Sequence, residues 1–504
     1  MTAQARSLSG VSLAQVMGGV AKIPPERDLM LQGLTLDSRR IRSGYLFLAC
    51  RGQQHHGLEF MMEARRRGAV AVAYDPDGAV EYLASLRDFP AYAVRDLQQH
   101  AGPMAARFYA DPSAAQTVIA VTGTNGKTSV SQIVAQALTG LGTPCGVLGT
   151  LGYGVFGDLE IPSHTTPDAV SVQGWLARFR DRGVQHVSME ASSHALDQGR
   201  LSGVHVAVAV FTNLTRDHLD YHPDMQSYGA AKRRLFGMPG LKHAVVNLDD
   251  DFGRQLPAGL SQAIGCTGYT LEPGRVFAGK LLRATHVSLH AGGTRFDVEG
   301  SFGTGHVQSR LLGAFNVGNL LAVLGVLLAL EVPFGQALRV IENAQTVPGR
   351  MECFGGGGRP LVVVDYAHTP DALEKALQVS RAHCRGLLSC IFGCGGERDR
   401  GKRAQMGAIA ARLADKIILT DDNPRHENGD AIIREILAGI GAFGGVQIQR
   451  DRARAVRQAV ESAAAGDVVL VAGKGHETYQ VVGDEQLAYS DRETVAGLLR
   501  QVTA

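Results

Sequence analysis

Short apolar runs recur along the chain, each four to seven residues long and each followed by a longer stretch of mixed composition. Runs of this length are typical of buried strands, and the stretches between them are long enough for covering helices. The runs occupy residues 46–49, 69–74, 117–122, 185–190, 206–212, 244–247, 361–365, 387–393, 417–421 and 468–473. This alternation predicts an α/β protein built on parallel sheets with helices on both faces.

Two changes of pattern divide the chain into three predicted domains. The first lies near Ala-Asp-Pro-Ser at 110–113, and the second follows Val-Pro-Gly-Arg at 347–350, after which the strand pattern restarts. The predicted domains are residues 1–112, 113–347 and 348–504, because chains of this length exceed one ordinary domain. Within the second domain, the alternation at 287–290 and 295–298 predicts an antiparallel hairpin inserted between 267 and 310.

The apolar run at 117–122 leads directly into a glycine loop and the start of a helix. Gly123 and Gly126 permit backbone angles that other residues disfavour, so successive N–H groups can point at an anion near a helix N-terminus. Lys127 would reach the β- and γ-phosphates, and the hydroxyl of Thr128 would bind Mg²⁺. Val121 stands where the usual pattern has a glycine, so this is a variant of the loop. The segment predicts a nucleoside triphosphate site.

Composition and charge exclude several classes of function. The chain has 50 Lys and Arg against 48 Asp and Glu, a formal charge of +2, so no global field favours nucleic acid or anionic lipid. The N-terminal residues lack the apolar segment of a secretory signal, and the longest apolar run, 320–330, is too short to span a bilayer. Seven cysteines without a Cys-x-x-Cys pair suit a reducing compartment. We expect a cytoplasmic protein without membrane insertion.

Groups that can bind metal follow two strands of the second domain. Glu190 at a strand end can ligate the Mg²⁺ held by Thr128, because this hard cation prefers oxygen ligands. His218 lies in a stretch rich in turn-forming residues and could complete a second metal site. A capping carboxylate and a hydrogen-bonded histidine are the alternatives for these two residues.

Polar residues also collect at the carboxyl ends of the predicted strands in the third domain. Ligands of doubly wound sheets bind beyond these ends. The residues are Asp365, Arg398, Asp422, Asn423, Lys474 and Glu477.

Four segments of the second domain together resemble the Mur ligase family. They are Thr-Gly-Thr-Asn-Gly-Lys-Thr at 122–128, Glu-Ala-Ser-Ser-His-Ala-Leu at 190–196, Asn-Leu-Thr-x-Asp-His-Leu-Asp-Tyr-His at 213–222 and Ala-Lys-x-x-Leu-Phe at 231–236. The resemblance spans nearly the whole chain. It implies a UDP-binding N-terminal α/β domain, a central doubly wound P-loop ATPase-like domain and a C-terminal Rossmann-like domain that binds an amino acid.

Asp-Asn-Pro-Arg at 422–425 resembles the signature of the family members that add diaminopimelate. The resemblance therefore implies an ATP-dependent amide ligase of peptidoglycan precursor synthesis. Its partners would be ATP, meso-2,6-diaminopimelate and UDP-N-acetylmuramoyl-L-alanyl-D-glutamate, whose D-glutamate γ-carboxylate passes through an acyl phosphate. Mg²⁺ would be the cofactor, and we expect a monomer.

The family pattern also implies the residues that handle nucleotide and metal. Lys127, His218 and Lys232 would be catalytic, and Lys232 would be carbamylated to N6-carboxylysine so that it binds metal with Thr128, Glu190 and His218. ATP would contact Gly123, Thr124, Asn125, Gly126, Lys127, Thr128, Ser129, Asn316, Asn319, Arg350 and Asp365. Considered alone, Asn316 and Asn319 would pass as helix caps, Arg350 as an interdomain ion pair and Lys232 as a solvated lysine.

Substrate contacts are implied in two parts of the chain. The UDP-muramoyl dipeptide would contact Ser38, Thr165, Thr166, Ser192, Gln198 and Arg200, and diaminopimelate would contact Arg398, Asp422, Asn423, Pro424, Arg425, Gly473 and Glu477. Diaminopimelate differs from lysine by one carboxylate, which the planar fork of Arg425 can bind through two parallel hydrogen bonds. Arg398 could hold the other carboxylate.

Three alternatives stay open at this point. A lysine-adding member of the same family would lack Arg425. A small-molecule kinase or NTPase shares the phosphate loop but needs no Ala-Lys-x-x-Leu-Phe segment and no amino-acid pocket. A nucleotide-binding paralogue without activity would have lost its metal residues.

Overall fold

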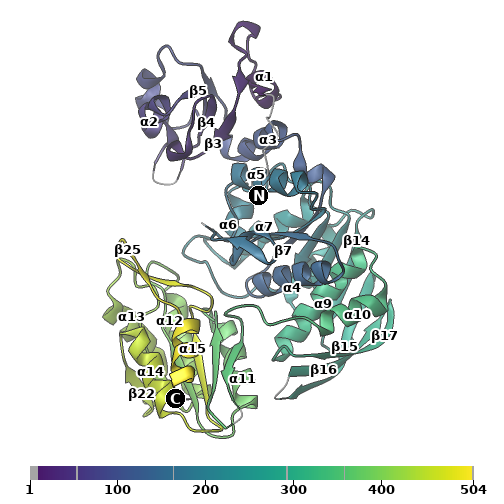
Figure 1. The fold of residues 1–504 in the computed structure, drawn as a ribbon, viewed down its shortest axis with the longest axis vertical. Coiled ribbons are helices and arrows are strands. Elements are labelled where there is room, and N and C mark those ends of the chain that lie inside the picture. Colours follow the sequence, from purple (N-terminus) through teal and green to yellow (C-terminus); the bar gives the residue numbers. More distant parts are fainter. Residues whose placement is uncertain (1–9, 53–54, 163, 291–292, 357, 502–504) are drawn as a thin grey trace. The chain divides into compact units, whose positions relative to one another are not determined.

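A computed structural model describes residues 10–52, 55–162, 164–290, 293–356 and 358–501 (Figure 1). The chain forms two compact units. The first unit comprises Met1–Thr122, Gly142–Ala209 and Ala231–Lys242, and the second comprises Gly123–Leu141, Val210–Ala230 and His243–Ala504. The division into three domains at 112 and 347 stays a prediction.

The N-terminal part of the first unit is a parallel four-stranded sheet in the order β3-β4-β5-β6. Its elements are β1 (Val11–Ser12), α1 (Leu13–Val16), β2 (Met30–Leu31), β3 (Gly33–Thr35), β4 (Tyr45–Ala49), α2 (Met61–Arg66), β5 (Ala69–Tyr74), β6 (Ala91–Ala93) and α3 (Leu97–Phe108). Both faces of β4 are buried, because Leu46 packs in the cluster with α1 and α3 whereas Phe47 packs in the cluster with α2. The predicted strands at 46–49 and 69–74 are confirmed.

The rest of the first unit adds strands in the order β10-β9-β8-β11-β7. The elements are β7 (Thr117–Thr122), β8 (Cys145–Gly149), β9 (Gly152–Val155), β10 (Asp158–Glu160), α5 (Ala169–Asp181), β11 (His186–Glu190) and α6 (Ser193–Asp197). Strand β11 pairs in parallel with β7, as predicted, and also with β8, a strand that the sequence pattern did not predict. Strands β9 and β10 are antiparallel, which the sequence pattern did not predict. The connections from β8 to β9 and from β9 to β10 are tight turns, too short for a parallel crossover.

The second unit begins with α4 (Lys127–Gly140) and continues with strands in the order β12-β13-β14-β15-β16-β17. Strand β12 (Val208–Phe211) and helix α7 (Met225–Arg233) cross the boundary between the units. The further elements are β13 (His243–Asn247), α8 (Asp251–Gln255), β14 (Gly265–Thr270), β15 (Lys280–His290), β16 (Gly293–Gly300), β17 (Gly303–Ser309), α9 (Ala314–Ala329) and α10 (Phe334–Glu342).

Strands β15, β16 and β17 confirm the predicted antiparallel hairpin insertion, with Ser288 opposite Arg295 in the register. The long apolar run lies mainly in α9, most of which is buried, as expected of a core helix. In the part of the chain that the structure describes, helices long and apolar enough to cross a bilayer are absent.

The C-terminal part of the second unit is a six-stranded sheet in the order β18-β19-β23-β20-β21-β22, parallel except for the edge strand β18. The elements of this part of the chain are β18 (Glu352–Gly355), β19 (Leu361–Asp365), α11 (Pro370–Ala382), β20 (Leu388–Phe392), α12 (Gly401–Leu413), β21 (Lys416–Leu419), α13 (Gly429–Ile440), β22 (Val446–Ile448), α14 (Arg452–Ser462), β23 (Val468–Ala472), β24 (Tyr479–Val482), β25 (Glu485–Ala488) and α15 (Asp491–Gln501). Strands β24 and β25 pair with each other as a separate two-stranded sheet.

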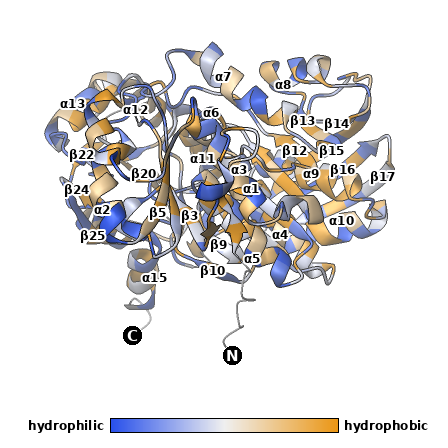
Figure 2. Cartoon of the chain, turned by 90° about the horizontal axis from the view of Figure 1, so that it is seen from above, coloured by the Kyte–Doolittle hydropathy of each residue, from blue (hydrophilic) through white to orange (hydrophobic). Residues whose placement is uncertain are grey.

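Helices cover both faces of this C-terminal sheet, so it is doubly wound as predicted. Val363 of β19 packs in the cluster with α11, α12 and α13, whereas Val362 and Val364 pack with α14 and α15. Strand β12 and helix α9 are largely hydrophobic, whereas α13 carries both hydrophobic and hydrophilic residues (Figure 2). The carboxyl ends of the parallel strands carry the loops that hold the candidate residues.

Candidate functional site

The predicted phosphate loop joins β7 to the N-terminus of α4. Gly126 is the N-cap of α4 and has a left-handed backbone, with φ of 85°. An added Cβ at Gly126 would lie 2.8 Å from Oδ1 of Asn319, and one at Gly123 would lie 1.9 Å from Oγ1 of Thr212. The loop therefore needs glycine at both positions, for backbone angle and for close approach.

The segment after β12 holds this loop in shape. The backbone N–H of Asn125 donates to Oδ1 of Asn213 at 2.9 Å, and the hydroxyl of Thr212 donates to the carbonyl of Asn125 at 2.6 Å. Nζ of Lys127 donates to the carbonyls of Gly123 and Thr124 at 3.0 and 2.8 Å. These bonds fix the backbone of the loop. The N–H groups at the N-terminus of α4 are then the donors that could bind an anion.

A cavity of about 450 Å³ adjoins the phosphate loop within the second unit. Its lining includes six of the residues predicted to contact nucleotide: Asn125, Gly126, Ser129, Asn319, Arg350 and Asp365. Asn316 lies one turn from Asn319 on α9, accepts a hydrogen bond from its amide at 2.9 Å and donates to the carbonyl of Leu312 at 2.8 Å. The helix cap is Gly313, so neither asparagine is the N-cap.

Arg350 connects the cavity to the phosphate loop. Its Nη2 donates to Oγ1 of Thr128 at 2.9 Å, and its guanidinium lies 4.4 Å from the ring centroid of Tyr366. Its buried Nε has no hydrogen-bond partner among the described residues. A cation held here with an unused donor suits a phosphate oxygen.

Asp365 ends β19 beside Arg350. Its Oδ2 accepts from the backbone N–H of Met351 at 2.7 Å, and burial raises its pKa. The sequence analysis did not predict that Asp371 and Lys375 of α11 also line the cavity. Asp371 accepts from Asn125 at 3.0 Å and is paired with Lys375 at 2.9 Å, so α11 contacts the phosphate loop directly.

His218 lies in a cluster of charge around the buried carboxylate of Asp217. The Nε2 atoms of His218 and His368 lie 3.4 and 3.6 Å from Oδ2 of Asp217, and Nζ of Lys402 lies 3.4 Å from Oδ1. Burial raises the pKa of Asp217, but Lys402 and the two histidines outweigh burial and hold it well below its usual value. Neither Asp217 nor Lys402 is predicted from the sequence, because the two residues lie far apart in the chain.

The predicted metal residues of the first unit are both buried. Glu190 ends β11 with no exposed surface, and its Oε1 accepts from the backbone N–H of Thr150 at 2.7 Å. Lys232 in α7 is only 1% exposed, so it is not a solvated lysine. In the second unit, Thr128 opens α4 and His218 contacts Asp217.

The donor atoms of these residues fit Mg²⁺. A carboxylate and a hydroxyl are hard oxygen ligands, and Mg²⁺ is usually held by one or two carboxylates together with substrate phosphates and water. Within the described ranges, clusters of three or more His, Cys, Asp or Glu side chains that could hold a metal by themselves are absent.

The residues predicted to contact the dipeptide form one connected group in the first unit. The hydroxyl of Thr166 donates to the carbonyl of Glu190 at 2.7 Å and lies 3.4 Å from Oγ of Ser192. Arg200 donates to the carbonyl of Thr166 at 2.8 Å and to Oε1 of Gln198 through Nε at 3.0 Å. Thr165 accepts at 3.2 Å from Thr150, whose backbone also binds Glu190. The structure thus links this group to the end of β11.

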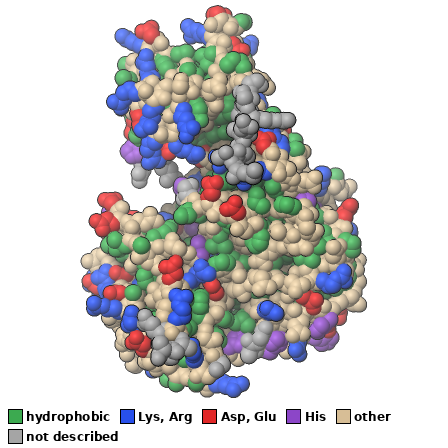
Figure 3. All heavy atoms as spheres, in the orientation of Figure 1, with side chains coloured by type: hydrophobic (Ala, Val, Ile, Leu, Met, Phe, Trp, Pro, Cys, Tyr) green, Lys and Arg blue, Asp and Glu red, His purple; other side chains and the backbone are tan. Residues whose placement is uncertain are grey.

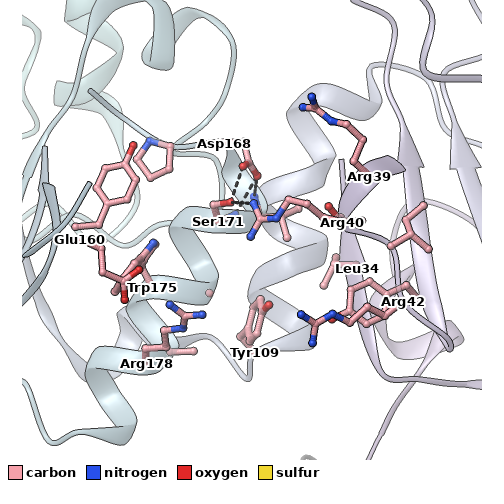
Figure 4. Close-up of a pocket in the computed structure, with 18 of the residues that line it drawn as sticks. Leu34, Arg39, Arg40, Arg42, Tyr109, Glu160, Asp168, Ser171, Trp175 and Arg178 are labelled. Carbon is pink, nitrogen blue, oxygen red and sulfur yellow. Dashed lines mark hydrogen bonds between the residues drawn. The ribbon is translucent and has the colours of Figure 1, made fainter. Parts of the chain in front are cut away.

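A large cavity of about 1230 Å³ lies in the same unit (Figure 4). Lys and Arg side chains gather over the elements around β3, β4 and β5 (Figure 3), and Arg39, Arg40 and Arg42 line the cavity together with Arg178 of α5. Ser38, the predicted contact, instead donates to Oε2 of Glu63 at 2.8 Å.

Helix α5 contributes aromatic and polar groups to this cavity. Arg40 donates to Oγ of Ser171 at 3.2 Å, and Trp175 lies one turn further along α5 (Figure 4). Several guanidinium groups beside aromatic rings suit a ligand that combines phosphate with a planar base. A local motif such as Asp-Ser-Arg does not predict this cavity, because the residues that line the cavity lie more than a hundred positions apart in the chain.

Four of the seven predicted diaminopimelate residues, Arg398, Asn423, Pro424 and Arg425, lie in two loops of the C-terminal sheet, residues 395–398 and 423–427, which we call the amino-acid loops. Arg425 has a positive φ of 54°, and its Nη1 donates to the carbonyl of Gly396 at 2.8 Å. Burial lowers the pKa of Arg425, and the neighbouring Arg398 guanidinium lowers it further. Two cations held near each other in this way suit a ligand with carboxylates.

A buried lysine organises the other wall of this region. Nζ of Lys474 has no exposed surface, and it donates to Oδ1 of Asn423 at 3.0 Å and to Oε2 of Glu477 at 2.7 Å. Asn423 in turn donates to Glu477 at 3.0 Å. Gly473 precedes this lysine, and a Cβ there would lie 2.6 Å from Oδ2 of Asp422. The structure therefore brings Asn423 close to Glu477 and Gly473 close to Asp422, and it places Arg398 and Arg425 beside Gly395.

Comparison with known proteins gives matches along the chain. Residues 31–109 match the model "Mur ligase family, catalytic domain", residues 121–327 match "Mur ligase middle domain", and residues 349–475 match "Mur ligase, glutamate ligase domain". Among curated proteins, the UDP-N-acetylmuramoyl-L-alanyl-D-glutamate–2,6-diaminopimelate ligase of Pseudomonas aeruginosa PAO1 is 50% identical over 468 residues, which cover 93% of this chain and 95% of that one. The protein of the same name from Coxiella burnetii RSA 493 is 46% identical over 467 residues, covering 92% and 95%.

Solved structures agree with these matches. One structure of a UDP-N-acetylmuramoyl-L-alanyl-D-glutamate–2,6-diaminopimelate ligase has a TM-score of 0.69 and 33% identity, and covers 98% of this chain and 100% of that one. A MurF structure from Acinetobacter baumannii has a TM-score of 0.66 at 19% identity, with 97% of each chain covered. The second likeness concerns the fold alone.

Proposed function

Because this chain belongs to the Mur ligase family, we propose that it adds meso-2,6-diaminopimelate to the D-glutamate γ-carboxylate of UDP-N-acetylmuramoyl-L-alanyl-D-glutamate, with cleavage of ATP. Relatives about half identical over nearly the whole chain carry the name of this activity. The observation that carries the proposal is that Arg398 and Arg425 both lie beside Gly395, where an added Cβ would be 3.1 Å from Nη1 of Arg425 and 3.6 Å from Cγ of Arg398. A site with two guanidinium groups fits an amino acid with two carboxylates.

The first step forms an acyl phosphate. The γ-carboxylate of the sugar-borne D-glutamate attacks the γ-phosphorus of ATP, the bond to the β,γ-bridging oxygen breaks, and ADP leaves. We assign the nucleotide contacts to Gly123, Thr124, Asn125, Gly126, Lys127, Thr128 and Ser129, with Asn316, Asn319, Arg350 and Asp365 around the base, ribose and phosphates. Lys127 and Arg350 would offset charge on the phosphoryl group, which is the main contribution a protein makes to such a transfer.

Thr128, Glu190, His218 and a carbamylated Lys232 are the residues that we propose for Mg²⁺. When bound, the cation supplies charge neutralisation of the phosphate oxygens. Burial of Lys232 supports its modification, because a desolvated amine is more easily neutral and a neutral amine reacts with CO₂.

The second step forms the amide. The neutral amine of diaminopimelate attacks the acyl carbon, and the tetrahedral intermediate collapses with release of inorganic phosphate. We assign the amino acid to Arg398, Asp422, Asn423, Pro424, Arg425, Gly473 and Glu477, with both carboxylates facing guanidinium groups and the distal ammonium facing Asp422 and Glu477. Rejection of lysine follows, because lysine would leave a guanidinium desolvated and unpaired, at a cost of about 1 to 3 kcal/mol.

The dipeptide is assigned to Thr165, Thr166, Ser192, Gln198 and Arg200, which form one hydrogen-bonded group with Glu190. The UDP moiety is assigned to the arginine-lined cavity beside Ser38. We further propose that the protein acts in the cytoplasm as a monomer, in peptidoglycan precursor synthesis, and that it binds no nucleic acid.

Phosphate release by the purified protein tests the function. With ATP, Mg²⁺ and the UDP-muramoyl dipeptide, we expect release to depend on meso-diaminopimelate, and mass spectrometry should detect the tripeptide product. Release with lysine alone would replace the proposal with lysine addition. ATP cleavage that is equally fast without dipeptide and amino acid would instead indicate an NTPase.

A further inference from the structure

The two amino-acid loops carry like charges that repel each other. Arg398 lies in one loop and Arg425 in the other, and the Arg398 guanidinium contributes to lowering the pKa of Arg425. An added Cβ at Gly395 would lie 3.1 Å from Nη1 of Arg425 and 3.6 Å from Cγ of Arg398, so the two side chains flank this glycine. Some other part of the fold has to fix their separation, because Coulomb repulsion drives them apart.

Arg403 of α12 lies beneath both loops with no exposed surface. Its Nη2 donates to the carbonyl of Gly395 in the first loop at 3.2 Å and to Oε2 of Glu427 in the second loop at 2.7 Å. Its Nη1 donates to Oε1 of Glu427 at 2.6 Å, which completes a bidentate pair. One buried guanidinium therefore binds both loops at once.

Glu427 forms a second connection between the two amino-acid loops. Its Oε2 also accepts from the backbone N–H of Glu397 in the first loop at 3.0 Å. Its carboxylate thus bridges Arg403 and the residue that precedes Arg398. Arg403 also donates from Nη1 to Oε2 of Glu435 at 2.9 Å, so the guanidinium keeps one carboxylate partner without Glu427. Glu427 is the partner that also binds the first loop, so its loss removes that connection between the loops.

Close backbone packing adds to this link. The N–H of Gly396 donates to the carbonyl of Asn423 at 2.9 Å, and an added Cβ at Gly396 would lie 1.9 Å from the carbonyl oxygen of Pro424. The loops therefore touch at backbone level only because position 396 has no side chain. The hydrogen bonds of Arg403 and Glu427 to the first loop add to this backbone contact.

We propose that Arg403 and Glu427 are positioning residues that set the distance between Arg398 and Arg425, and through it the preference for a diamino acid with two carboxylates over lysine. This inference rests on the proposed function. Neither residue needs to touch the substrate. Arg403 and Glu427, which we call the clamp, act by holding the guanidinium groups of Arg398 and Arg425 at the separation that the two carboxylates of the amino acid require.

Kinetics of two variants test the clamp. Glu427→Gln keeps the size of the side chain but removes its charge, and Arg403→Lys keeps the charge but cannot bind both loops. We expect the KM for meso-diaminopimelate to rise about tenfold to a hundredfold in each variant. The kcat at saturating amino acid and the KM for ATP should stay within about twofold, and the ratio of kcat/KM for diaminopimelate to that for lysine should fall.

Arg412→Met is the matched control, since Arg412 lies on the same helix but is 60% exposed and pairs with Glu374 at 2.6 Å. Its kinetics should equal those of the unaltered enzyme. An unchanged KM for diaminopimelate, or a parallel fall in every parameter, would overturn the clamp. Loss of folding in both variants would assign the network to stability and would also overturn it.

Measurements on the unaltered protein distinguish failure of the proposed function from failure of the proposal for Arg403 and Glu427. If it shows no activity with diaminopimelate, the proposed function fails before any variant is considered. If it is active and selective while Glu427→Gln keeps the same selectivity, only the clamp fails.

Discussion

Under the proposed function, the phosphate loop and the amino-acid loops bind anions in opposite ways. At the phosphate loop, the donors are backbone N–H groups, and glycine angles such as that of Gly126 set their direction within a few residues. At the amino-acid loops, the proposed donors are the side chains of Arg398 and Arg425, and the buried guanidinium of Arg403 on α12 binds both loops. The first design is local in sequence, whereas the second depends on the assembled sheet.

The largest expected effect concerns the charge at the phosphate loop. We expect Lys127→Ala to lower kcat by on the order of 10³-fold, because the lost ammonium offsets charge that develops on the phosphoryl group. Phosphate release under saturating substrates measures it. The midpoint of thermal unfolding should change little, since the hydrogen bonds that the side chain donates to Gly123 and Thr124 lie within the loop itself. Activity within about tenfold of normal would remove Lys127 from catalysis.

The next effect sharpens the contrast at the amino-acid loops. Arg425→Lys keeps the positive charge but loses the planar fork, so we expect kcat/KM for meso-diaminopimelate to fall about a hundredfold. The corresponding value for ATP should not move. Isotope-labelled amino acid and product chromatography give both numbers. If Lys at this position supports normal diaminopimelate addition, a bidentate contact is not the source of specificity.

The same contrast explains which parts of the molecule could be predicted from sequence. The phosphate loop and the apolar strands were predictable because each depends on neighbours in the chain, and the structure confirms the strand at 117–122 as β7. The pair Asp217 and Lys402 could not be predicted, since 185 positions separate its members. Arg403 was equally hidden, because a buried arginine in a helix looks like a surface residue until its partners are known.

A smaller effect tests the local design of the phosphate loop. Gly126→Ala forces a side chain into a left-handed backbone and toward Oδ1 of Asn319, at a cost of about 1 to 2 kcal/mol. We expect the KM for ATP to rise by about tenfold. Gly140→Ala at the end of α4 is the control, because its Cβ would meet nothing within 4 Å. Equal KM values for the two variants would show that the angle at Gly126 is unimportant.

The smallest effect concerns stability at acidic pH. We expect Glu427 at the amino-acid loops to make stability depend on pH, whereas the backbone N–H groups of the phosphate loop do not titrate. The hydrogen bonds from Arg403 lower the pKa of Glu427 from 4.5 to about 2. A lowered pKa means that this carboxylate stabilises the folded state fully above pH 4.5, and that the contribution is lost as the pH falls toward about 2. In that window, Glu427→Gln should therefore lose stability with falling pH less steeply than the unaltered protein, by at most about 1.4 kcal/mol per pH unit. Urea unfolding at a series of pH values measures the slope. Gly126→Ala should keep the slope of the unaltered protein, because no titrating group is changed there. If Glu427→Gln and Gly126→Ala both keep that slope, Glu427 does not take up a proton on unfolding in this pH range. The charge of Glu427 then contributes nothing to acid stability.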